Sequence, residues 1–184
     1  NYSFHNSPVI SSYPYLEGFE SGHGNWFAKG SNTSWAWGVP SKTNISKAAN
    51  GDNIWTTNLT GNHNDNEFSY LYSPCFDLSG LTQPVLSFSH TFQVELDYDY
   101  TWVEYSIDGK VWNKLGAVGS GTNWYDNATL VNWRVSDTLW HVASIDVPPY
   151  TGNMRFRIVM SSDGGVREQG VAIDMPAGPS EVLV

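Results

Sequence analysis

Oxygen-bearing side chains stand in three short segments of this chain, in a pattern that suits a calcium ion. They are Glu20 in GFESG, Asp52 and Asn53 in NGDN, and Asp174 in VAIDM. Calcium takes roughly six to eight oxygen ligands from carboxylates, amide side chains and backbone carbonyls of flexible loops. We therefore predict these four residues as ligands of a structural calcium ion. The alternative for Asp52 and Asn53 is that they only form a turn.

The sequence gives little support for catalysis. It contains no GxSxG, HExxH, P-loop or GxGxxG motif, and its five histidines show no metal-ligand spacing. Asp97 and Asp99 alternate around Tyr98, a spacing that we interpret as a solvated strand end rather than a catalytic carboxylate pair. Cys75 is the only cysteine, and we expect it to be a buried, small apolar side chain. The chain is therefore predicted not to be an enzyme.

Aromatic residues occur in long segments that have little strand character: Trp26, Trp124, Tyr125 and Trp133. Flat aromatic faces stack on sugar rings, so these four residues are candidate ligand-binding anchors. The alternative, which we favour, is that they pin the loops onto the core. Trp112 and the remaining tryptophans of the patterned segments are assigned to structure.

One tripeptide suggests a modification. Asp137-Thr138-Leu139 resembles the short Asp-Ser/Thr-apolar acceptor of Bacteroidetes O-glycosylation. In that case Thr138 carries the glycan. A turn before the strand at Leu139 explains the same residues equally well.

The elements that must position these residues are β-strands. Apolar and polar residues alternate through 86–94, 101–107, 139–147 and 154–160, and Asp108-Gly109 is a strong hairpin signal. The pattern predicts an all-β, two-sheet antiparallel sandwich. Its inter-sheet core should contain Phe88, Phe92, Tyr105, Ile107, Phe156 and Ile158.

Length and composition limit the class of protein. The 184 residues suit one β-sandwich domain. We expect a leader or linker over 1–15 and the domain over 16–184, although Pro176 makes the closing strand after Asp174 irregular. A net charge of −9 with nine basic residues argues against nucleic-acid binding. No apolar run is long enough for membrane insertion.

Several motifs together resemble a known family of modules. They are GFESGHGNW, SWAWGVP, NGDNIWTTNLTGNHND, NDNEFSYLYSPCFDLSG, VEYSIDGKVWNKLG and GVREQGVAID, which span roughly residues 17–174. They are similar to the MAM-like (jelly-roll) modules of Bacteroidetes secreted and cell-surface proteins of the type IX secretion kind, akin to cleaved-adhesin domains. The resemblance implies that Glu20 and Asp174 lie on neighbouring strands and share one structural calcium. Asp52 and Asn53 match less closely.

These observations lead to one functional expectation. The chain is interpreted as a non-catalytic adhesion or spacer module, secreted or on a bacterial cell surface, within a larger protein and with structural calcium. Its expected partners are other domains of the same polypeptide, surface proteins or glycans. The alternative is a carbohydrate-binding module that uses the loop aromatics.

Overall fold

The computed structural model describes residues 8–174, and all of its regular structure is β-strand. The strands are β1 (Val9–Ile10), β2 (Phe27–Ser31), β3 (Trp35–Gly38), β4 (Ile54–Thr57), β5 (Phe68–Asp77), β6 (Val85–Gln93), β7 (Tyr100–Ser106), β8 (Asn113–Lys114), β9 (Gly121–Thr122), β10 (Asp137–Asp146), β11 (Asn153–Ser161) and β12 (Gly170–Asp174). No helix that is long and apolar enough to cross a bilayer occurs in this part of the chain.

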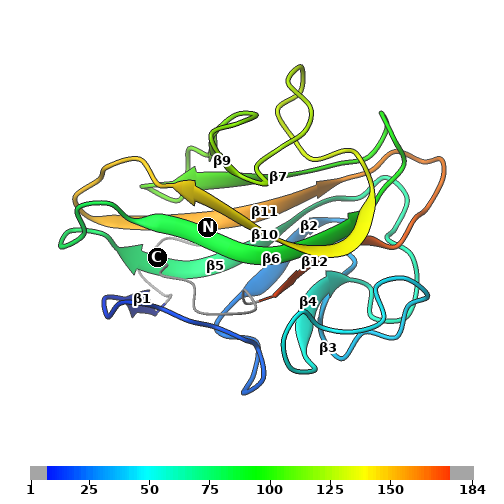
Figure 1. The fold of residues 1–184 in the computed structure, drawn as a ribbon, viewed down its shortest axis with the longest axis horizontal. Coiled ribbons are helices and arrows are strands. Elements are labelled where there is room, and N and C mark those ends of the chain that lie inside the picture. Colours follow the sequence, from blue (N-terminus) through cyan, green and yellow to red (C-terminus); the bar gives the residue numbers. More distant parts are fainter. Residues whose placement is uncertain (1–7, 175–184) are drawn as a thin grey trace.

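The strands form two six-stranded sheets that lie over one another (Figure 1). The first sheet has the order β1-β5-β11-β7-β8, with β2 also paired to β5, and the second has the order β3-β4-β12-β6-β10-β9. All pairs are antiparallel except β1 with β5. The predicted all-β, two-sheet antiparallel sandwich is confirmed.

Alternation along the strands buries one face of each sheet against the other. Four of the six predicted core residues are buried between the sheets: Phe88, Phe92, Phe156 and Ile158. Tyr105 is half-buried and packs against this core. The prediction for Ile107 is wrong, because β7 ends at Ser106 and Ile107 lies in the following turn, 46% exposed.

The predicted hairpin joins β7 to β8, but its turn is wider than the two residues of a tight hairpin. Gly109 has a φ of 71°, the left-handed conformation that favours glycine. Asp108 acts through its side chain, whose Oδ1 accepts hydrogen bonds from the backbone N–H groups of Lys110 (2.8 Å) and Val111 (2.9 Å). The turn is therefore stabilised by a carboxylate as well as by a glycine.

Part of the segment that we predicted as a leader or linker is paired with the sandwich. Val9 and Ile10 lie parallel to Cys75 and Phe76 of β5. The hydroxyl of Tyr13 lies 2.8 Å from the carbonyl oxygen of Asp77. The division of the chain at residue 15 stays a prediction, and the predicted irregular closing segment after Asp174 lies outside the described residues.

Candidate functional site

The first predicted calcium ligand, Glu20, holds the backbone of the loop that contains two of the others. Its Oε1 accepts hydrogen bonds from the N–H groups of Asp52 (3.0 Å) and Asn53 (2.7 Å). These hydrogen bonds, led by that of Asn53, keep the pKa of Glu20 below its usual value. Gly51 has a φ of 72°, and a Cβ there would stand 2.5 Å from Cδ of Glu20. The loop approaches the carboxylate closely because residue 51 is glycine.

Asp174 binds the same loop from another side. Its Oδ2 accepts a hydrogen bond from the N–H of Asn50 at 2.9 Å, and its side chain is buried at the end of β12. Loop 50–53 is thus held by two carboxylates that come from opposite ends of the sequence. Within residues 8–174, no three His, Cys, Asp or Glu side chains gather as a metal-binding group. A calcium ion here would need backbone carbonyl ligands in addition to Glu20 and Asp174, and the calcium site stays a prediction.

The four loop aromatics are packed into the molecule rather than presented to solvent. Trp124, Tyr125 and Trp133 are 2%, 6% and 4% exposed and belong to the main core, and Trp26 is partly buried against it. Trp124 Nε1 donates a hydrogen bond to the carbonyl of Leu115, and Trp133 contacts Tyr125 edge to face, with ring centroids 4.6 Å apart. This burial favours loop anchoring over ligand binding.

The predicted glycosylation site lies at the start of β10. Thr138 is exposed there, and its neighbours Asp137 and Leu139 are joined by a hydrogen bond from the Leu139 N–H to Oδ1 of Asp137 at 2.9 Å. The register of β10 against β6 shifts just beyond this point, between Asp137 and His141. The geometry leaves Thr138 accessible, and its modification stays a prediction.

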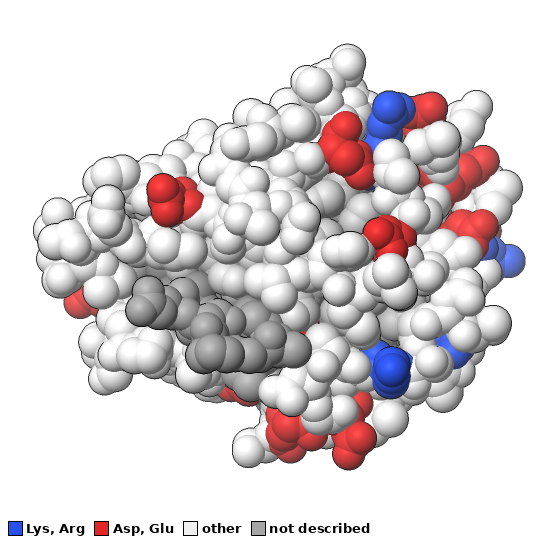
Figure 2. All heavy atoms as spheres, in the orientation of Figure 1, with Lys and Arg blue, Asp and Glu red and all other residues white. Residues whose placement is uncertain are grey.

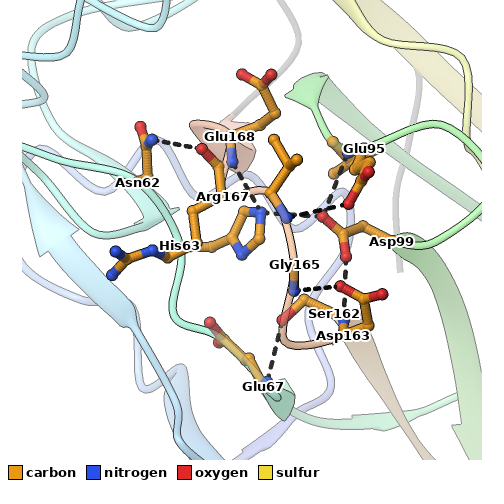
Figure 3. A network of polar contacts seen from close by, with 12 residues as sticks. Asn62, His63, Glu67, Glu95, Asp99, Ser162, Asp163, Gly165, Arg167 and Glu168 are labelled. Carbon is orange, nitrogen blue, oxygen red and sulfur yellow. Dashed lines mark hydrogen bonds and ion pairs between the residues drawn. The ribbon is translucent and has the colours of Figure 1, made fainter.

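A buried polar network ties together the loops at one end of the sandwich (Figure 3). His63 Nε2 lies 3.1 Å from Oδ2 of Asp99, and both side chains are 1% exposed. Burial, the largest single influence, opposes the charged imidazole, but the hydrogen bonds to Asp99 and Asn64 and the charges of Asp99 and Glu67 together outweigh it and raise the pKa of His63. Asp99 also accepts hydrogen bonds from the N–H groups of Glu95 and Asp163. Our interpretation of Asp99 as a solvated strand end is wrong, because loops distant in sequence cover it.

A second buried carboxylate reinforces this end. Oε1 of Glu67 accepts hydrogen bonds from the Ser34 N–H (2.9 Å) and the Ser69 hydroxyl (2.5 Å), while Oε2 accepts from the Ser34 hydroxyl (2.5 Å) and the Asn64 N–H (3.2 Å). A His–Asp pair occurs in several catalytic triads, but a substrate has no access to His63 and Asp99 in this conformation. We interpret the network as structural.

A cluster of accessible aromatic rings lies on the solvent face of the first sheet. We call it the ring platform, and it consists of Phe27, Phe68, Tyr70, Tyr72, Trp102 and Trp112. Their rings touch in a series, with centroid separations of 5.0 Å for Phe27–Tyr72, 5.4 Å for Tyr72–Trp112 and 5.4 Å for Phe68–Tyr70. Phe68 is 44% exposed and the other five are half-buried.

Arg157 stands at the centre of the ring platform. Its guanidinium carbon lies 3.9 Å from the ring centroid of Tyr70 and 4.1 Å from that of Trp112. Nε donates a hydrogen bond to Glu104 at 2.6 Å, and one terminal nitrogen donates to the Tyr72 hydroxyl at 2.9 Å. Glu104 in turn accepts a hydrogen bond from Trp102 Nε1 at 2.8 Å. These contacts fix the rings in place, so that a ligand would meet a preorganised surface.

The sequence analysis did not predict the ring platform, although part of it is visible as an alternating pattern of aromatic residues. Phe68, Tyr70 and Tyr72 alternate with Ser69, Leu71 and Ser73, so an aromatic face is visible in β5. Phe27 lies in a segment without apolar alternation, and its strand β2 was not predicted. Trp112 was assigned to structure. Only the pairing of β2, β5, β11 and β7 brings these side chains onto one face.

Comparison with curated sequences gives one partial relative. The relative is Bacillopeptidase F of Bacillus subtilis (strain 168). This chain is 31% identical to it over 161 residues, which are 87% of this chain. The chain spans only 10% of the length of that protein. No protein-family model matches the chain.

Solved structures resemble the chain in fold. TmCBM61 in complex with beta-1,4-galactotriose has a TM-score of 0.53 at 14% identity, over 85% of this chain and 90% of that one. The xylan-binding domain from CBM 22 has a TM-score of 0.52 at 12% sequence identity, and the match covers 89% of this chain and 91% of that domain. The K2 cleaved adhesin domain of Lys-gingipain has a TM-score of 0.51 at 16% sequence identity, and the match covers 88% of this chain and 96% of that domain. The chain therefore shares the β-sandwich fold of these adhesin and carbohydrate-binding domains.

Proposed function

We propose that this chain is a non-catalytic adhesion module of a larger secreted or cell-surface protein, and that it adheres to glycans through the ring platform. The observation that carries the proposal is the set of six touching aromatic rings on the solvent face of the first sheet. Large accessible aromatic faces beside fixed polar groups are the chemistry that binds sugar rings. The carbohydrate-binding alternative is thus retained, with its surface moved from the loop aromatics to the sheet.

The parent protein is proposed to be longer than this chain. The 31% identity to one tenth of Bacillopeptidase F supports a module that recurs within larger polypeptides. Its placement among MAM-like modules of Bacteroidetes surface proteins rests on the sequence motifs alone. Other domains of the same polypeptide and surface proteins remain proposed partners.

Retention in native gels that contain soluble polysaccharides, neutral and acidic, tests the adhesive role. At least one polysaccharide should retard the chain, and Tyr70→Ala or Trp102→Ala should weaken binding by roughly fivefold to a hundredfold, as the loss of an aromatic anchor does at interfaces. Tyr98→Ala, which removes an exposed ring outside the platform, is the matched control. If no polysaccharide retards the chain, a spacer role replaces the adhesive one.

The proposal includes a structural calcium ion at loop 50–53. Glu20 and Asp174 would bind it together with oxygen atoms of the loop, and the ion would fix the loop to β12. The two carboxylates that already contact this loop support the proposal. Because an ion that binds only the folded state stabilises it by mass action, millimolar calcium should raise the melting temperature relative to chelator. Asp174→Asn should reduce that rise.

A further inference from the structure

The ring platform lies on the sheet whose strands contain more basic residues, one of which, Arg155, is buried. The strands of the first sheet contain six charged residues: Lys29, Asp77, Glu104, Lys114, Arg155 and Arg157. Four are basic and two are acidic, so these strands carry a net charge of +2 in a chain of net charge −9. The rest of the chain therefore carries −11. Figure 2 shows Asp and Glu distributed over the drawn face of the molecule, with Lys and Arg beside several of them at its right-hand end.

The strand register arranges the basic groups and rings in rows across the sheet. One row is Phe27, Tyr72, Arg157, Glu104 and Lys114. The next row is Lys29, Tyr70, Val159 and Trp102. Because neighbouring strands are about 4.8 Å apart, a row of five strands spans about 19 Å. That length suits several units of a polymer better than a single small molecule.

Basic side chains stand at both edges of these rows and at their centre. At one edge, Nζ of Lys114 lies 4.6 Å from the ring centroid of Trp102 and donates a hydrogen bond to the carbonyl of Leu130. At the other edge, Lys29 is exposed and pairs in register with Tyr70. At the centre, Glu104 balances the charge of Arg157. Lys29 and Lys114 therefore place basic groups at the two edges of the ring platform.

We infer that the ring platform binds an acidic polysaccharide, laid across the strands with its sugar rings on the aromatic faces and its anionic groups toward Lys29 and Lys114. The inference rests on the proposed function and names its ligand class. Rings alone would accept a neutral chain equally well, and the flanking lysines add the selectivity for anionic groups. The acidic remainder of the chain repels such a polymer elsewhere, which directs it to this face.

The inference is tested by titrating the whole chain with three polysaccharides: polygalacturonate, dextran sulfate and neutral galactan. Polygalacturonate should bind more tightly than galactan at low ionic strength, and added salt should weaken its binding, since screening acts on exposed charges. Dextran sulfate distinguishes the anion, because tighter binding to it would identify sulfate rather than carboxylate groups. Either acidic polymer binding at the platform supports the inference.

Matched charge variants locate the site. Lys29→Gln and Lys114→Gln should each weaken the binding of the acidic polymer by roughly fivefold at low salt, the most that one exposed ion pair gives. Lys47→Gln removes an exposed lysine outside the strands of the first sheet and should leave binding unchanged. Equal melting temperatures of the variants exclude unfolding as the cause.

The possible failures separate the two proposals. One outcome is that galactan binds as tightly as polygalacturonate, and that Trp102→Ala weakens binding while Lys114→Gln does not. This outcome overturns the acidic ligand and supports adhesion to glycans in general. If Lys47→Gln weakens the binding of the acidic polymer as much as Lys29→Gln and Lys114→Gln do, the attraction is non-specific, and the inference is also overturned. If none of the three polymers binds, both the inference and the adhesive role fail.

Discussion

The imidazole of His90 stacks on the ring of Phe92, with centroids 5.6 Å apart and an interplanar angle of 6°. His90 lies on the core-facing side of β6, as the alternation of that strand predicts, and its side chain is buried. Burial, with a smaller contribution from His141, lowers the pKa of His90 to about 4. The folded protein therefore holds this histidine neutral across the mildly acidic range.

The first prediction concerns the pH dependence of stability. Between pH 6.5 and about 4 the unfolded chain protonates residue 90 while the folded chain does not, so the stability present above pH 6.5 is lost as the pH falls. The loss should reach on the order of 3 kcal/mol. His90→Phe should flatten this part of the profile in urea unfolding. His63 has a raised pKa and so changes the pH dependence of stability in the opposite direction. Its contribution is the same in the original chain and in His90→Phe, so the comparison isolates His90. An unchanged profile would contradict the prediction.

A second prediction concerns the buried carboxylate of Glu67. Glu67→Gln keeps the size of the side chain but turns one acceptor into a donor that faces other donors, so we expect a loss of about 2 kcal/mol in the free energy of unfolding. Glu168→Gln is the control, since that carboxylate points away from the network in Figure 3. Similar losses in the two variants would show that Glu67 has no special role.

The third prediction tests the loop anchors. Trp124→Ala should cost about 3–5 kcal/mol, because it empties a buried site that contacts Phe88 and Trp133. Retention on a polysaccharide should persist at temperatures where the variant stays folded. A variant of unchanged melting temperature that no longer binds would instead make Trp124 a ligand contact.

The fourth prediction concerns the glycine beneath Glu20. Gly51→Ala should lower the free energy of unfolding by about 1–2 kcal/mol, because alanine is strained at positive φ and its Cβ would meet the carboxylate. The calcium-dependent rise in melting temperature should shrink with it. Gly61→Ala is the control, because a Cβ there meets no atom within 4 Å. If Gly51→Ala and Gly61→Ala change the free energy of unfolding and the calcium-dependent rise in melting temperature equally, the prediction is contradicted, and loop 50–53 has no part in the calcium response.

Period-two patterning predicted the sandwich because it records which face of a strand is buried. It placed Phe88, Phe92, Phe156 and Ile158 correctly, and it gave Cys75 as buried, which the structure confirms. It could not predict β2 (Phe27–Ser31), since that strand lies at the side of its sheet, where apolar alternation is weak. Composition and alternation thus determine the layers of the fold.

The candidate surfaces depend on contacts between residues that are far apart in sequence. Asp99 is buried because the segment around Asp163 and the side chain of His63 cover it. The ring platform arises only when β11 places Arg157 between Tyr70 and Trp112. A single sequence shows each residue's chemistry but not the strand register that joins them.

The edges of both sheets are short. Among the described residues, the edge strands β1, β8 and β9 have two residues each, β3 has four and β2 has five. An edge strand of this length offers few unpaired backbone groups to a neighbouring chain, so it is a poor template for sheet extension. Copies of this chain are therefore expected not to join through these sheet edges, even at high local concentration.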